Sequence, residues 1–95
     1  MRLAAKPDSN QKHIVAILRQ CGATVRILAM VGQGVPDLLV GFRGANYLLE
    51  VKWCKGKLTY AEERWQEGWR GQVAIVHTVE EALREIGALV VEGER

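Results

Sequence analysis

Apolar residues between positions 14 and 21 recur at helical spacing. They lie three or four residues apart and predict a helix over about residues 10–21. Asp8 or Ser9 would cap the first turn of this helix, and Gly22 would take the left-handed conformation that ends it. The residues that set the spacing are Ile14, Ile17, Leu18 and Cys21.

Three shorter apolar runs follow, in residues 25–30, 38–42 and 47–53. Their length and their content of β-branched and aromatic residues predict strands. Residues 43–46 contain Gly and Asn and would join the last two strands as a hairpin. The glycines and proline of residues 31–36 predict a turn before that hairpin.

Two Thr-x-x-Glu patterns predict the starts of two further helices, over residues 60–69 and 79–86. In such a capping box the hydroxyl and the carboxylate satisfy free amides of a first turn. Between these helices, residues 72–77 read as a buried strand, and Val90 and Val91 would form a last strand or pack as a tail. The two patterns are Thr59 with Glu62 and Thr78 with Glu81.

The resulting order is helix, strand, strand, strand, helix, strand, helix. It is typical of a mixed α/β domain with a small central β-sheet flanked by helices. A length of 95 residues, 48% of them hydrophobic, suits one domain over residues 1–95. Such a short chain has a thin core, so an oligomeric interface would be a natural supplement.

Composition excludes several classes of protein. The net charge of +2 is too weak for a dedicated basic arm, although six basic residues in the middle of the chain could line one face. Cys21 and Cys54 lack the paired spacing of a zinc site. No secretory signal opens the chain and no apolar run approaches a membrane span, so we expect a soluble protein in a reducing compartment with no membrane partner. The six basic residues are Arg43, Lys52, Lys55, Lys57, Arg64 and Arg70.

Strand alternation brings three charged residues to one face. Glu50 and Lys52 are two residues apart in one predicted strand and therefore point the same way. If Phe42 and Tyr47 close the hairpin, Asp37 lies opposite Lys52 and diagonal to Glu50, on that same face. The sequence therefore predicts a cluster of two carboxylates and one ammonium group.

Two converging carboxylates repel each other unless a cation lies between them, and Mg²⁺ uses one or two carboxylates together with water and substrate oxygens. A neighbouring lysine can orient a water or neutralise charge that develops on a phosphate. An ordinary cross-strand ion pair of Asp37 with Lys52 is the alternative. The apolar residues on both sides of the charges favour a functional site, because buried unpaired charge is costly.

The motif Gly34-Val-Pro-Asp37-Leu-Leu-Val, followed by Leu49-Glu50-Val51-Lys52, resembles the signature of PD-(D/E)xK nucleases. Within that superfamily the chain resembles the VRR-NUC (virus-type replication-repair nuclease) family, in particular its stand-alone phage and bacterial members. The resemblance covers nearly the whole chain, from Asn10-Gln11 to Glu81-Ala-Leu83.

This resemblance implies a restriction-endonuclease-like core and a metal-dependent endodeoxyribonuclease. Asp37, Glu50 and the main-chain carbonyl of Val51 would hold Mg²⁺ or Mn²⁺, and Lys52 would assist the attacking water. The products would be a 5′-phosphate and a 3′-hydroxyl. Stand-alone relatives imply a homodimer that acts on branched DNA such as Holliday junctions, in the cytoplasm of a bacterial or phage-infected cell.

Two positions depart from the family pattern. Glu62 stands where many relatives carry glutamine, with Gln66 one turn further on; Glu62 would be either a third ligand or the capping residue proposed above. Gln11 stands where the first helix of relatives often contributes a glutamate to the site. These departures keep open a second hypothesis, a non-catalytic DNA-binding or assembly module that retains the nuclease fold.

Other side chains near the motif suggest contacts with DNA or packing. Lys55, Lys57 and Arg64 follow the motif strand closely enough to contact phosphates. Trp65 and Trp69 are four residues apart and share a helix face, so we expect them in the core or in dimer packing.

Overall fold

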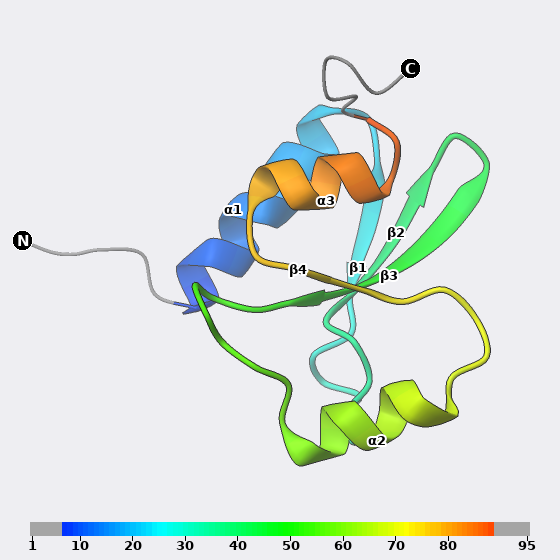
Figure 1. Ribbon diagram of the computed structural model, residues 1–95. Helices are drawn as coiled ribbons and strands as arrows, with labels where there is room; N and C mark the ends of the chain where they lie inside the picture. Colours follow the sequence, from blue (N-terminus) through cyan, green and yellow to red (C-terminus); the bar gives the residue numbers. More distant parts are fainter. Residues whose placement is uncertain (1–6, 89–95) are drawn as a thin grey trace, which may run out of the picture.

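The order of elements predicted from the sequence is confirmed. The computed structural model describes residues 7–88 (Figure 1). The elements are α1 (Pro7–Gln20), β1 (Thr24–Ile27), β2 (Leu38–Phe42), β3 (Ala45–Val51), α2 (Tyr60–Gly68), β4 (Ala74–Val76) and α3 (Val79–Glu85).

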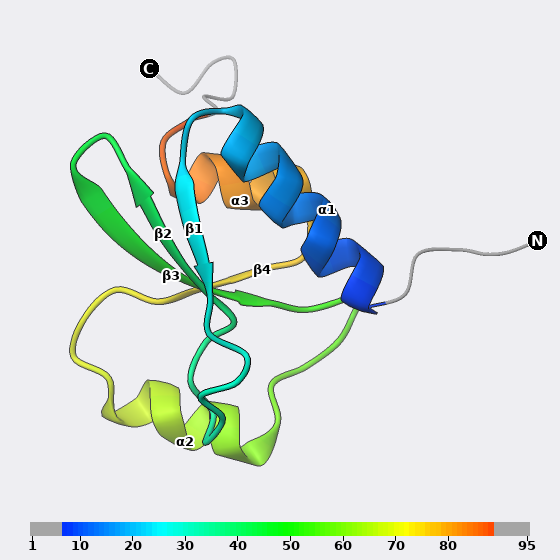
Figure 2. The ribbon, with the colours of Figure 1, turned by 180° about the vertical axis from the view of Figure 1, so that it is seen from behind.

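The four strands form one mixed sheet in the order β1-β2-β3-β4. β1, β2 and β3 pair antiparallel, and β4 pairs parallel to β3. α1 and α3 lie side by side against one face of the sheet, whereas α2, in the crossover between β3 and β4, lies at the other side of the molecule (Figures 1 and 2). The predicted class, a small mixed sheet flanked by helices, is confirmed.

The hydrophobic core fills the space between the sheet and the helix pair α1 and α3. Alternation along β2 decides which residues enter it: Leu38 and Val40 are fully buried, whereas Leu39 between them is 37% exposed. Full burial of each such side chain contributes about 1.5–3 kcal/mol. The largest core side chains are Ile14, Leu18, Leu38, Val40, Leu49 and Val76.

The first helix begins earlier than the sequence predicts. α1 starts at Pro7, so Asp8 and Ser9 lie inside it and the predicted cap at these residues is wrong. Proline has a backbone angle suited to the first helical position, which explains the early start. α1 ends at Gln20, one residue before the predicted Cys21, but the predicted left-handed conformation of Gly22 is confirmed: its φ is 96°, and the Ala23 N–H donates to the Leu18 carbonyl.

The hairpin turn is shorter than predicted. Phe42 pairs with Ala45, so the loop is Arg43-Gly44 and not residues 43–46. Both turn residues have positive φ, 52° and 82°, which is the type I′ turn that matches the twist of two-residue hairpins. The register therefore differs by two residues from the predicted one, and a shift of two keeps every side chain on its predicted face.

Other element ends also differ from the prediction. β1 ends at Ile27 rather than at residue 30, because the chain turns at Leu28, whose carbonyl accepts from the Val31 N–H. β4 covers only 74–76 of the predicted 72–77. α2 and α3 each end one residue early, because Trp69 and Ile86 are their C-terminal caps. Val90 and Val91 lie outside the described residues.

Side chains take over the hydrogen bonds beyond both ends of β4. At its start, Gln72 Oε1 accepts from the Leu48 N–H at 2.6 Å and Gln72 Nε2 donates to the Leu48 carbonyl at 3.1 Å. At its end, Glu81 accepts from the His77 N–H at 2.6 Å. Thr78 does cap α3, but its predicted partner Glu81 is bound to His77, so only half of that capping box forms.

A search of residues 7–88 for a helix long and apolar enough to cross a membrane finds none.

Candidate active site

Asp37 bridges the start of β2 and the end of β3. Its carboxylate Oδ2 accepts from the Val51 N–H at 2.8 Å. One step along the observed register from the Leu38–Leu49 pair, Asp37 lies level with Glu50, not with Lys52 as the predicted register had it. The observed register therefore brings the carboxylates of Asp37 and Glu50 closer together than the predicted register does.

Glu50 is an ionisable residue that is almost completely buried. It is 1% exposed, and its Oε1 has no hydrogen-bond partner in the described structure. Burial, then the hydrogen bond and the charge of Asp37, then the charge of Glu62, raise its pKa to about 9, against the opposing effect of Lys52. Without a bound metal ion, Glu50 therefore holds a proton at neutral pH.

Lys52 directly follows the end of β3, and its side chain points toward Glu50 and Glu62. Its Nζ lies 3.7 Å from Glu50 Oε2 and 2.6 Å from Glu62 Oε1, and its side chain is 15% exposed. Its main-chain N–H donates to the Val76 carbonyl, which fixes the strand end. Burial acts to lower the lysine pKa, but the hydrogen bond and charge of Glu62, with the two other carboxyls, outweigh it and raise that pKa. Lys52 is therefore a cation in this site.

Glu62 is the capping residue of α2, which was one of its two predicted roles; the other was a third metal ligand. Its Oε1 accepts from the Thr59 N–H at 2.8 Å, and Thr59 Oγ1 accepts from the Glu62 N–H at 3.2 Å, which completes a capping box. The same Oε1 also receives the Lys52 ammonium. Burial acts to raise the Glu62 pKa, but Lys52 and the Thr59 N–H outweigh it and hold that pKa below its usual value.

A glycine holds the first turn of α2 against the loop that precedes Asp37. Gly34 has a φ of 83°, and a Cβ at this position would fall on the main-chain carbonyl of Ala61. Only glycine fits such a close approach of two backbones. The loop that delivers Asp37 and the helix that delivers Glu62 are therefore in direct contact.

The structure brings four of the predicted site residues together. Asp37, Glu50, Lys52 and Glu62 form one cluster. Gln11 is half-buried in α1, and in the described part of the chain no hydrogen bond or ion pair joins it to that cluster. Its neighbour makes a contact that the sequence did not predict: Asn10, 9% exposed, donates to the His77 carbonyl at 3.2 Å and ties α1 to the end of β4.

The side-chain amide of Gln66 is buried with a donor that no described residue satisfies. It lies one helical turn after Glu62 in α2, and its Nε2 is buried without a hydrogen-bond partner among the described residues. A buried donor of this kind is costly unless a ligand or water satisfies it. Its predicted accessory role therefore stays a prediction.

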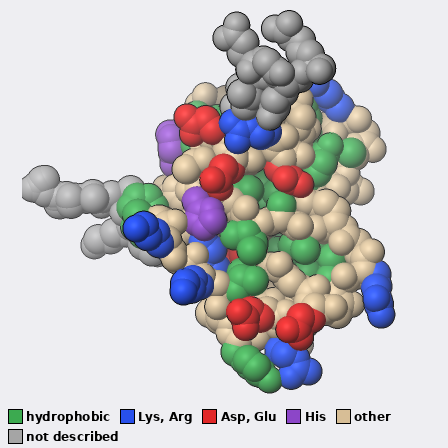
Figure 3. All heavy atoms as spheres, in the orientation of Figure 1, with side chains coloured by type: hydrophobic (Ala, Val, Ile, Leu, Met, Phe, Trp, Pro, Cys, Tyr) green, Lys and Arg blue, Asp and Glu red, His purple; other side chains and the backbone are tan. Residues whose placement is uncertain are grey.

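The basic residues do not gather into one cluster. Arg43 and Lys52 lie at opposite ends of β3. Lys55 and Lys57 are exposed in the segment between β3 and α2, and Arg64, 63% exposed, pairs with Glu67 and donates to the Tyr60 hydroxyl. On the face drawn in Figure 3, basic and acidic side chains are interspersed among exposed hydrophobic ones. Phosphate contacts by Lys55, Lys57 and Arg64 stay predictions.

The donor set of the cluster fits a hard divalent cation. Among residues 7–88, no group of three His, Cys, Asp or Glu side chains is arranged to hold a metal ion. The candidate donors are two carboxylates, from Asp37 and Glu50, and the main-chain carbonyl of Val51. Mg²⁺ accepts such a small set of oxygens because it keeps several waters. The partnerless buried oxygen of Glu50 is the atom that such a cation would satisfy.

Comparisons with known proteins give one clear structural relative. No family model matches the sequence, and no curated protein matches it. A solved structure described as a VRR_NUC domain superimposes with a TM-score of 0.69 and is 31% identical in sequence. The match covers 86% of this chain and 97% of that chain.

Proposed function

The chain belongs to the VRR-NUC family, and from this premise we propose that it is a metal-dependent DNA endonuclease whose reaction depends on Asp37, Glu50 and Lys52. The observation that carries the proposal is the buried carboxyl of Glu50 beside Asp37, because its Oε1 has no hydrogen-bond partner among the described residues. A fold that only needed stability would gain little from this pair, because a buried carboxyl beside a second carboxyl is costly to ionise.

The three side chains have separate tasks in this proposal. Asp37 and Glu50, with the Val51 carbonyl, would hold Mg²⁺ or Mn²⁺. Such an ion polarises a phosphodiester and generates a nucleophile from water. Asp37 is preorganised for its task, because the Val51 N–H fixes its carboxylate at 2.8 Å.

Lys52 acts as a positively charged donor. Its ammonium is held by Glu62 at 2.6 Å, so it enters the reaction already oriented. Its raised pKa favours donation of a hydrogen bond to the phosphate or to the attacking water over removal of a proton. The expected products are a 5′-phosphate and a 3′-hydroxyl.

The finer proposal concerns the substrate and the assembly. We infer that the enzyme acts on branched DNA such as four-way junctions, as a homodimer. Two sites related by two-fold symmetry would allow matched cuts in two strands. The family membership and the small private core of a 95-residue chain support this proposal.

A cleavage panel tests the proposed function. Purified protein is incubated with duplex, flap and four-way DNA, each with Mg²⁺, with Mn²⁺ and with EDTA. Metal-dependent cleavage of at least one substrate is expected, and Glu50→Gln should abolish it. Absence of metal-dependent cleavage on every substrate would sink the proposal.

A non-catalytic DNA-binding or assembly module is the second candidate function. The observation that favours it is the 2.6 Å pair of Glu62 with Lys52, which occupies the lysine in the described structure. Such a module would bind branched DNA without cleaving it, and Glu50→Gln would hardly change that binding. Calorimetric titration with Mn²⁺ separates the two candidates, because only a retained catalytic centre should bind the ion.

A further inference from the structure

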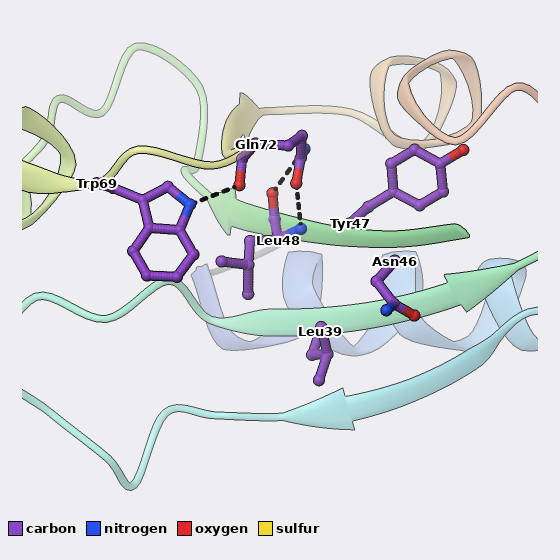
Figure 4. A pocket seen from close by; sticks show the side chains of 6 residues that line it. All are labelled: Leu39, Asn46, Tyr47, Leu48, Trp69 and Gln72. Atoms are coloured by element: carbon purple, nitrogen blue, oxygen red, sulfur yellow. Dashed lines mark hydrogen bonds between the residues drawn. The ribbon is translucent and has the colours of Figure 1, made fainter. Parts of the chain in front are cut away.

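An apolar hollow lies on the sheet face that α1 and α3 leave uncovered. It has a volume of about 320 Å³. Figure 4 shows the indole of Trp69 at one end and the amide of Asn46 at the other, with Leu39 and Leu48 between them. The lining residues are Leu39, Asn46, Tyr47, Leu48, Trp69 and Gln72.

Strand alternation makes this hollow continuous with the candidate active site. Leu39 follows Asp37 by two residues, and Leu48 precedes Glu50 by two residues in β3. Residues two apart in a strand share a face and lie about 7 Å apart. Both aliphatic residues therefore adjoin, on the same face, the two carboxylates that would hold the metal ion.

Trp69 is held rigidly and yet remains open to solvent. Its ring stacks on Trp65 with centroids 4.5 Å apart, and its Nε1 donates to the Gln72 carbonyl at 3.0 Å. It is nevertheless 42% exposed. An indole fixed on one side and exposed on the other has the form of a stacking platform for an unpaired base.

The neighbours of Trp69 are also fixed. The side chain of Gln72 is bound to both main-chain groups of Leu48, so it serves the shape of the hollow and is not free for a ligand. Asn46 is exposed at the far end and carries the donor and acceptor groups that can meet the edge of a base. The hollow therefore combines a rigid aromatic wall, an aliphatic floor and one polar end.

We propose that this hollow binds the unstacked base of a nucleotide next to the scissile phosphate, with Trp69 as the stacking surface. The inference rests on the proposed nuclease function, because the occupant follows from the position of the hollow, whose Leu39 and Leu48 lie about 7 Å along their strands from the two carboxylates. A base inside a duplex is stacked and paired, so it reaches the hollow only after it is unstacked. The site therefore selects DNA with an unpaired nucleotide at the cleavage point.

An abasic scan of the substrate tests the proposal without altering the protein. In a flap DNA, nucleotides near the cleavage point are replaced one at a time by an abasic residue, and kcat/KM is measured for each substrate. Loss of the stacked base should lower kcat/KM by about 5- to 150-fold at one position. A scan in which no position changes the rate more than about twofold would overturn the proposal.

Variants of the hollow show whether Trp69 causes that penalty. Trp69→Ala should remove the penalty of the sensitive abasic position, whereas Trp69→Phe should keep it. If Trp69→Ala fails to fold, Leu39→Glu replaces it. This variant places a charge in the hollow and should likewise remove the penalty of the sensitive abasic position. Ala16→Glu adds the same charge to an exposed position of α1, across the sheet, and should behave as the unaltered protein. A full abasic penalty in both Trp69→Ala and Leu39→Glu would contradict the proposal.

A fluorescence measurement separates failure of this inference from failure of the proposed function, because it requires no turnover. Flap DNA that carries 2-aminopurine at the unpaired nucleotide is titrated with the unaltered protein in Mg²⁺. A parallel titration uses Lys52→Ala, which is expected to bind the DNA without cleaving it. Stacking on Trp69 should quench the fluorescence, and Trp69→Ala should abolish the quenching. If the unaltered protein quenches the fluorescence but does not cleave, the base-binding hollow is retained and the nuclease function is rejected. If it cleaves without quenching, the nuclease function is retained and the base-binding hollow is rejected.

Discussion

Glu62 uses one carboxylate oxygen for two purposes. It closes the capping box of α2 and it holds the ammonium of Lys52. Its capping role could be predicted from the Thr-x-x-Glu pattern, but its contact with Lys52 could not, because that contact depends on where α2 docks. The alternation that placed Glu50 and Lys52 on one face is a local property of a strand, so it was readable from the sequence.

Glu62→Gln should slow cleavage with little loss of folding. The amide oxygen can still accept from the Thr59 N–H, but the charge that holds Lys52 is gone. We expect kcat to fall by about tenfold, which corresponds to the loss of one charge-assisted contact. Glu81→Gln makes the same change at the start of α3 and is the matched control. Equal activity of the two variants would show that Glu62 only caps its helix.

Glu50→Gln should stabilise the metal-free protein at neutral pH. The folded-state pKa of Glu50 is about 9, raised from 4.5, so its unfavourable effect begins as the pH rises above 4.5 and grows up to about 9. In EDTA at pH 7 the variant should gain on the order of a few kcal/mol, and the gain should disappear near pH 4. Chemical denaturation across this pH range measures it. A constant difference at all pH values would contradict the assigned cause.

At the scale of elements, the sequence predicted existence and order better than boundaries. The hairpin is the clearest case. Arg43-Gly44 forms a type I′ turn, although arginine rarely takes a positive φ and the pair lacks the usual Asn-Gly or Asp-Gly signature. The predicted loop is therefore two residues too long. Asp37 nevertheless lies on its predicted face of the sheet, because a register shift of two residues does not change the face of a side chain.

The contact between the glycine-rich loop and α2 gives a prediction at this scale. Gly34→Ala would drive a Cβ into the Ala61 carbonyl and separate α2 from the loop that carries Asp37. Gly32→Ala introduces the same backbone strain at a φ of 74°, but its Cβ meets open space. Both should lose about 1 kcal/mol through strain, and only Gly34→Ala should also lose most of its activity. Equal activities would show that this contact does not position the site.

At the scale of the whole molecule, burial explains what the sequence could not show. The pattern predicts that Leu39 and Leu48 belong to strands, but not that α1 and α3 would cover the opposite face and leave these side chains at the surface. Within residues 7–88, the lack of a hydrogen bond or ion pair between Gln11 and the cluster likewise depends on the packing of α1 against the sheet. Both depend on tertiary packing, which no local pattern encodes.

The homodimer is a prediction about the molecule as a whole. Sedimentation at micromolar concentration should give twice the mass of one chain, and cleavage of the two strands of a four-way junction should be coupled in time. A monomer that still cuts both strands together would contradict the two-site account.

We propose that Asp37 and Glu50 form the metal-dependent centre of a nuclease. Single-turnover cleavage of the preferred DNA, in Mg²⁺ and in Mn²⁺, compares the unaltered protein with Asp37→Ala and with the control Glu81→Gln. We predict that Asp37→Ala loses at least about 10³-fold in rate, because the preorganised carboxylate that would hold the metal ion is removed, while the control stays within about twofold. Undiminished cleavage by Asp37→Ala would contradict the account.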